Sequence, residues 1–174
     1  VLYLHGGGVL ETTGTIARAV GTGAGNVSFS GSGGFAARGG ALGVTLNSGA
    51  TLSVGGTASF VPAYYSLVLG SASADNVLTL SNSLDSVANG WWPGINVVHN
   101  TGLANLSVDK VILNGSLNWT GGNNANTYWH KYGNGRLEIA GAPGSQSGGS
   151  GVVVAGGALA LTGPASLGGF RGVW

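Results

Sequence analysis

Short runs of alternating apolar and polar residues recur along this chain and are separated by glycine-rich corners. Residues 132–163 show the pattern most fully: in Arg136–Ile139 the alternation places the two apolar side chains on one face of a strand and the two charged ones on the other. A loop rich in Gly, Ser and Gln follows, then three valines at 152–154, a Gly-Gly break, and alternating alanine and leucine at 158–161. Three short strands separated by glycine corners are typical of one turn of a parallel β-solenoid.

A small residue, any residue and then leucine open a strand at several places in the chain. Three of these leucines, Leu117, Leu137 and Leu159, lie 20 and then 22 residues apart. With about 20 to 22 residues in each turn, the pattern predicts an all-β protein, a parallel β-helix of roughly eight coils that forms a single domain over residues 1–174. Stacked turns place like residues above one another, so asparagines near corners are candidates for ladders: Asn26, Asn47, Asn76, Asn114 and Asn134.

Further strand candidates fit between these leucines, at 15–19, 26–29, 44–46, 51–54, 66–69, 77–80, 97–98 and 110–113. An antiparallel sandwich could also use strands this short, but it would prefer tight two-residue hairpins, which are scarce in this chain. Two segments break the pattern, and we expect irregular loops or a widened coil there: residues 86–101, with Trp-Trp-Pro-Gly, and the Asn-rich residues 121–130.

Composition narrows the possible partners. The net charge is +1 and the six cationic residues are scattered, so no basic stripe is available for a nucleic acid. Apolar runs fall far short of the roughly 20 residues that span a bilayer, so we expect no membrane span in this segment. The chain has no Cys, which rules out disulfides and suits an exported protein. Because it begins without Met in a strand-like run, we expect it to be a segment of a longer protein or fibre.

Two regions of the chain are similar to one known family. Residues 132–163 read YGNGRLEIAGAPGSQSGGSGVVVAGGALALTG, and residues 4–56 read LHGGGVLETTGTIARAVGTGAGNVSFSGSGGFAARGGALGVTLNSGATLSVGG. Together these regions resemble the autotransporter-associated β-strand repeat proteins of bacteria with two membranes. The resemblance extends to about residue 84 and again over residues 133–169, roughly two thirds of the chain. The resemblance implies a right-handed parallel β-helix, export to the extracellular space or the outer-membrane surface, and a passenger-like role in adhesion, aggregation or scaffolding. It implies no catalytic residues.

The few titratable residues give little support to an enzyme. The acids are widely separated: Glu11, Asp75, Asp85, Asp109 and Glu138. Glycoside cleavage needs an acid and a base on one face, and only Asp85 and Asp109 lie about one expected coil apart. The three histidines lack any metal-ligand spacing. We therefore predict no catalytic, metal-binding or cofactor-binding residues and no enzyme activity.

Tryptophans are the best candidates for an interaction site. The chain has five: Trp91, Trp92, Trp119, Trp129 and Trp174. An indole ring can stack on a sugar, cover a neighbouring molecule or fill the interior of the stack, and the sequence leaves all three open.

Both ends of the chain are apolar strand-like runs without an evident polar cap. A β-helix exposes unpaired backbone groups at the ends of its stack, so these ends favour end-to-end or lateral self-association. We therefore expect a structural or adhesive fibre component. The alternative is a β-helix that binds or cleaves glycans, and cell-surface glycans or neighbouring cells are possible partners in either case.

Overall fold

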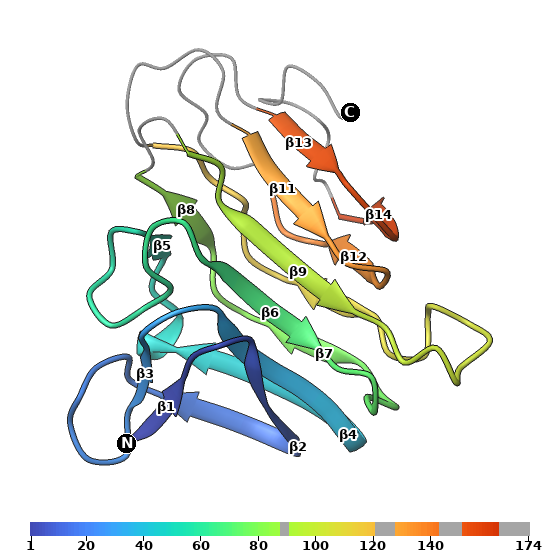
Figure 1. Ribbon diagram of the computed structural model, residues 1–174, viewed down its shortest axis with the longest axis horizontal. Helices are drawn as coiled ribbons and strands as arrows, with labels where there is room; N and C mark the ends of the chain where they lie inside the picture. Colours follow the sequence, from blue (N-terminus) through green and yellow to red (C-terminus); the bar gives the residue numbers. More distant parts are fainter. Residues whose placement is uncertain (88–90, 121–127, 143–150, 164–174) are drawn as a thin grey trace.

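The computed structural model describes residues 1–87, 91–120, 128–142 and 151–163 (Figure 1). Among them the regular elements are β-strands and one short 3-10 turn at Asn47–Gly49, so the protein is all-β as predicted. The strands are β1 (Leu2–Leu4), β2 (Gly8–Arg18), β3 (Val27–Phe29), β4 (Gly33–Leu46), β5 (Leu52–Val54), β6 (Ser66–Gly70), β7 (Leu78–Leu80), β8 (Leu84–Ser86), β9 (Gly94–Val98), β10 (Val111–Leu113), β11 (Tyr128–Tyr132), β12 (Arg136–Ile139), β13 (Gly151–Val154) and β14 (Ala158–Leu161).

Every strand pair is parallel, and most strands belong to one large sheet. Its strand order is β13-β11-β9-β6-β4-β7-β10-β12-β14, with β2 also paired to β4. The long strand β4 joins two arms, because residues 33–35 pair with β6 and residues 42–44 pair with β7. The first arm runs from β4 through β6, β9 and β11 to β13, and the second from β4 through β7, β10 and β12 to β14. The pairs β1-β3 and β5-β8 form two separate two-stranded sheets, which we group together as the third side.

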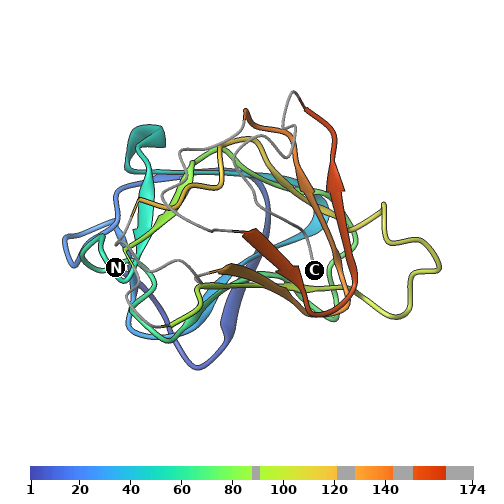
Figure 2. The same ribbon diagram turned by 90° about the horizontal axis from the view of Figure 1, so that it is seen from above.

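The chain turns from the first arm to the second within β4, at a glycine pair. Gly39 has a φ of 74°, a conformation that residues with a side chain rarely adopt. Seen from above, the two arms and the third side surround a common interior, so the sheet nearly closes on itself (Figure 2).

The spacing between paired strands varies along the chain. In the second arm, Leu42 pairs with Leu78, Leu78 with Val111, Val111 with Leu137, and Leu137 with Leu159. These steps are 36, 33, 26 and 22 residues, so the predicted spacing of 20 to 22 is right only for the last one. Leu117, which set the expected period, is not in this column, because it pairs with Leu84 on the third side. Connecting loops of unequal length cause the variation.

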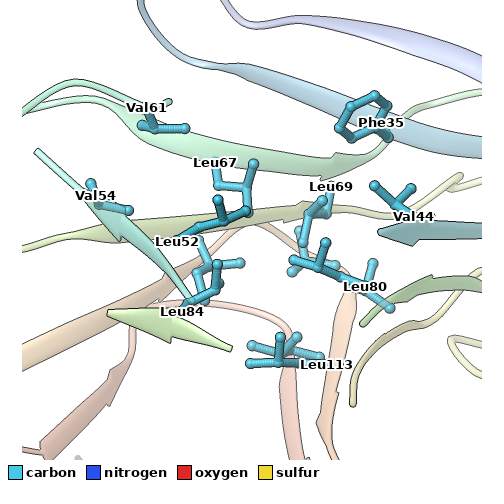
Figure 3. Close-up of a cluster of buried hydrophobic side chains, with 14 of the residues drawn as sticks. Phe35, Val44, Leu52, Val54, Val61, Leu67, Leu69, Leu80, Leu84 and Leu113 are labelled. Carbon is cyan, nitrogen blue, oxygen red and sulfur yellow. The ribbon is translucent and has the colours of Figure 1, made fainter. Parts of the chain in front are cut away.

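Inward-facing side chains from successive strands stack into apolar columns. In the second arm one column contains Val44, Leu80, Leu113 and Ile139, each no more than 3% exposed. Leu67 and Leu69 of the first arm and Leu52, Val54 and Leu84 of the third side meet them in one cluster (Figure 3). Full burial of such a side chain contributes about 1.5–3 kcal/mol, which makes the columns the main source of stability.

The expected irregular loops are only partly right. Strand β9 lies within residues 86–101, and it extends beyond the two-residue strand candidate at 97–98. Pairing with β6 and β11 on its two edges explains why this segment is regular. In the second segment, residues 121–127 lie outside the described residues, and β11 begins at Tyr128.

Asparagines at corners bond to the backbone of a neighbouring turn. The buried Asn82 accepts from the Leu46 nitrogen at 2.8 Å and donates to the Leu46 and Ala50 carbonyls, both at 2.7 Å. Asn134 binds the backbone of His99, and Asn47 accepts from the Val20 nitrogen. These side chains thus replace strand hydrogen bonds where the ladder stops at a corner.

Glycines occupy the same corner in successive turns. Two residues beyond the Leu80, Leu113 and Ile139 column lie Asn82, Gly115 and Gly141. A Cβ added at Gly115 would overlap the Asn82 backbone, and one at Gly141 would overlap the Gly115 carbonyl oxygen and lie 2.7 Å from that of Asn114. Backbone therefore rests directly on backbone at this corner.

Replacing Gly141 by alanine should destabilise the fold, because backbone atoms surround the position and none can move aside like a flexible side chain. We expect the Gly141→Ala variant to lose about 1–3 kcal/mol of unfolding free energy, measured by chemical denaturation. Gly43→Ala is the matched control, since the nearest atom to its Cβ would be the Gly14 oxygen at 3.8 Å. Equal stability of the two variants would contradict the account of this corner.

Candidate functional site

The structure places the predicted tryptophans in different environments. Trp119 and Trp129 are 0% and 1% exposed, so their rings fill the interior. Trp91 is 9% exposed and packs against the Tyr64 ring with centroids 5.6 Å apart. Trp92 is 57% exposed, and Trp174 lies outside the described residues. Of the five candidates, Trp92 therefore offers the largest described indole surface for a partner.

Three rings on the outer side of the first arm form a continuous stack, which we name the aromatic strip: Trp92, His130 and Tyr132. Trp92 and His130 have ring centroids 5.0 Å apart with an angle of 19° between the planes. His130 and Tyr132 follow at 5.4 Å and 29°. Strand register explains the stack, because His130 of β11 pairs with Gly94 of β9, two residues beyond Trp92.

Gly94 makes room for the strip. A Cβ at this position would overlap the Ser66 hydroxyl and lie 3.1 Å from the Tyr132 ring. The same register places Ser66 of β6 beside Gly94, and the exposed Tyr64 and Tyr65 precede Ser66. Aromatic residues therefore come just before the strand in two adjacent turns of the first arm.

Sequence reasoning identified only Trp92 of the strip. His130 and Tyr132 alternate with the buried Trp129 and Lys131, so the period-two pattern of β11 could have placed them on the outer face. Burial lowers the pKa of the His130 imidazole below its usual value, which favours the neutral ring at pH 7. The strip is thus an uncharged aromatic surface, suited to stacking rather than to proton transfer.

The acidic residues lie apart, each with its own partners. Glu11 accepts from Arg38 at 3.0 Å and from Ser71 at 2.6 Å, and Glu138 accepts from Lys110 at 2.9 Å. Hydrogen bonds, from Ser71 above all at Glu11 and from Lys110 at Glu138, lower both carboxyl pKa values and keep the groups ionised. Neither is then a good proton donor for glycoside cleavage.

Asp85 and Asp109, the pair about one expected coil apart, lie on different sides of the structure. Asp85 belongs to β8 of the third side and accepts from the Thr120 backbone nitrogen at 2.9 Å. Asp109 precedes β10 of the second arm and binds His99 Nδ1 at 2.7 Å. Within the described ranges, no group of three or more His, Asp or Glu is placed to hold a metal ion.

His99 and Asp109 close the base of a projecting loop, seen beyond the ends of β6 and β9 in Figure 1. The second ring nitrogen of His99 faces the Leu103 carbonyl at 3.2 Å, and the other Asp109 oxygen accepts from the Asn100 nitrogen at 2.7 Å. Both residues are buried, and these contacts give the pair a structural role in holding the loop.

The N-terminal end of the stack is hollow, and we name β2 with this hollow the open end. Among the described residues, β2 pairs only with β4, so its other edge carries unpaired backbone groups. The hollow measures about 320 Å³, and its apolar lining includes Leu2, Leu10, Ile16 and Val27. Leu2, Leu10 and Ile16 are only partly buried here, whereas their counterparts in the middle of the stack are buried.

Searches against protein-family models, curated proteins and solved structures each returned no match. The resemblance to autotransporter-associated β-strand repeat proteins therefore stays a prediction. In the part of the chain that the structure describes, no helix is long and apolar enough to cross a membrane.

A lysine, Lys131, lies inside the stack. Lys131 is 1% exposed and occupies the inward column of the first arm between Ile95 and Val154. Its Nζ donates to the Gly133 carbonyl at 2.8 Å and to the Gly156 carbonyl at 2.7 Å, so it joins corners of two successive turns. Burial lowers the pKa of its ammonium group to about 8.

This lowered pKa predicts a pH dependence of stability. The unfolded chain holds the Lys131 proton up to the ordinary value of 10.5, whereas the folded chain releases it near pH 8, so stability should rise between these values. Between pH 7 and pH 10.5, we expect the unfolding free energy of the wild type to rise by on the order of 3 kcal/mol relative to that of Lys131→Met. Chemical denaturation at the two pH values measures this difference. A parallel change in both proteins would contradict the assignment.

Proposed function

We propose that the chain is a structural or adhesive segment of a right-handed parallel β-helix, exported to the extracellular space or the outer-membrane surface. The order of strands supports the helix, because the chain visits the first arm, the second arm and the third side repeatedly in that sequence. Counting the passes through the first arm, at β2, β4, β6, β9, β11 and β13, suggests six turns rather than eight. Crossovers between parallel strands are right-handed in nearly all proteins, which favours this hand.

The open end is the observation that carries the structural role. An exposed parallel edge above a half-covered apolar interior is a template for another strand, and proteins normally protect such edges. Self-association through this end would bury the hollow and complete the ladder. The lack of cysteine and the resemblance to exported passenger proteins support the extracellular location.

Among the described residues, the titratable groups support binding and structure better than catalysis. The carboxylates are ionised or engaged with their own partners, and the His99–Asp109 pair is enclosed in its loop. We therefore propose a protein without enzyme activity, whose partners are copies of itself and the surfaces of neighbouring cells.

The aromatic strip favours one second candidate function, the binding of glycans. Exposed aromatic rings present apolar faces that stack on sugar rings, and the Ser66 hydroxyl beside Gly94 is a polar group close by. Glycan binding is compatible with a surface fibre, so this candidate would add an adhesive activity to the structural role.

Charge at the open end should prevent assembly. The side chain of Ile16 borders the hollow, so a lysine there can reach solvent in a single chain but would be buried without a partner in a stack. We expect wild-type protein to form filaments or larger species at high concentration and Ile16→Lys to stay monomeric, measured by electron microscopy and sedimentation.

Thr79→Lys provides the control for this experiment, because it adds the same charge to the outer face of a central strand. It should assemble like the wild type. Wild-type protein that remains monodisperse at high concentration would argue against the structural proposal.

Loss of the Trp92 ring should weaken any glycan binding. We expect Trp92→Ala to lower the apparent affinity for polysaccharide at least tenfold, since a central aromatic contact contributes about 2 kcal/mol or more. The affinity is measured from the retardation of the protein in polysaccharide-containing native gels. Tyr3→Ala removes an equally exposed ring from β1 and should have no effect. If wild-type mobility is unchanged in all polysaccharides and no reducing ends appear, the glycan candidate fails.

A further inference from the structure

The two ends of the stack carry different strand edges that fit one another. At the open end, β2 exposes the edge opposite β4, and at the other end β14 pairs only with β12 among the described residues. Residues 14–18 of β2 pair with residues 42–46 of β4, so they extend the second arm that ends at β14. The two strands run in the same direction, because every intervening pair is parallel.

The inward columns of the second arm end on apolar residues at both edges. One column begins at Ile16 and ends at Leu161, which is 36% exposed. The neighbouring column begins at Gly14 and ends at Leu159, which is half-buried. Every described residue between these ends in the two columns is almost fully buried. The end residues therefore lack the next layer that their column would otherwise supply.

Within the described residues, neither β14 nor residues 14–17 of β2 carry the usual protection against pairing. Edge strands commonly place lysine, proline or an inward charge where another strand would add. Residues 14–17 of β2 are Gly, Thr, Ile and Ala, and β14 is Ala, Leu, Ala and Leu. The charged residues that flank this segment of β2 bind groups of the same molecule. Glu11 binds Ser71 and Arg38, and Arg18 donates to the Gly25 carbonyl at 3.3 Å.

Head-to-head pairing of two open ends fits less well. It would place two β2 strands antiparallel and bring two hollows of about 320 Å³ together, so neither would be filled. Head-to-tail pairing instead sets the leucines of β14 over the hollow and keeps the ladder parallel. Repetition of this contact leaves a free edge at each end, so it generates a filament rather than a closed dimer.

We infer that copies of this chain join head to tail, with β14 of one copy pairing in parallel with residues 14–17 of β2 in the next. In this register Leu159 stacks on Gly14, Leu161 stacks on Ile16, and Ala160 lies level with Thr15 on the outer face. The inference rests on the proposed self-association and adds its contact and register.

A disulfide tests the register directly, because the chain has no cysteine of its own. In the double variant Thr15→Cys, Ala160→Cys, the two Cα atoms of adjacent copies would lie about 4.8 Å apart, within disulfide range. Mild oxidation should produce a ladder of covalent oligomers on a non-reducing gel. The matched control, Ala17→Cys with Ala160→Cys, shifts one cysteine by two residues to a distance of about 8 Å, which a disulfide cannot bridge.

The outcomes separate the register from the proposed function. A ladder in the first double variant but not in the control supports the inference. Filaments without the ladder, a ladder in the control alone, or covalent dimers of the single variant Thr15→Cys would overturn it while self-association stands. Absence of any wild-type assembly would overturn the inference together with the structural proposal.

Discussion

Register between stacked parallel strands is the constraint on which the rest of the structure depends. Each inward side chain must meet the one in the turn below, so Leu42, Leu78 and Val111 form a column although loops of different length separate them. A slip of one residue would expose the whole inward set to solvent. The same register aligns the corner glycines, and on the outer face it brings His130 beside Gly94, so that the rings of the strip can stack.

Polar groups inside the stack form hydrogen bonds between successive turns, so they fit the same register. Asn82 reaches the backbone of Leu46 in the preceding turn, and Lys131 joins the carbonyls of Gly133 and Gly156. A buried amide or amine without such partners would lower the stability of the fold by several kcal/mol. Here each group instead links two successive turns by hydrogen bonds. The interior therefore combines apolar columns, which provide most of the stability, with a few polar links at the corners.

Alternation in the sequence predicted the all-β class and many strands, such as Arg136–Ile139, because the inward and outward faces differ in polarity. It could not predict the spacing of turns, since Leu117 and Leu137 look alike in sequence but belong to different sides. The solvent exposure of the tryptophans could not be predicted either. Trp91 and Trp92 are neighbours with opposite exposure, because exposure depends on the adjacent turns. The strip is likewise a product of pairing between β9 and β11, strands joined by a long connection.

The connections between strands differ in length, but this does not affect the stacking of the strands. The strands keep their register whether 22 or 36 residues join successive partners, so the axis of the stack tolerates loops of very different size. The loop closed by His99 and Asp109 is one example, because it projects without disturbing β9 or β10. Insertions at corners can thus change what the sides of the protein expose while the register along its axis stays the same, so the surface can vary without any change in the core.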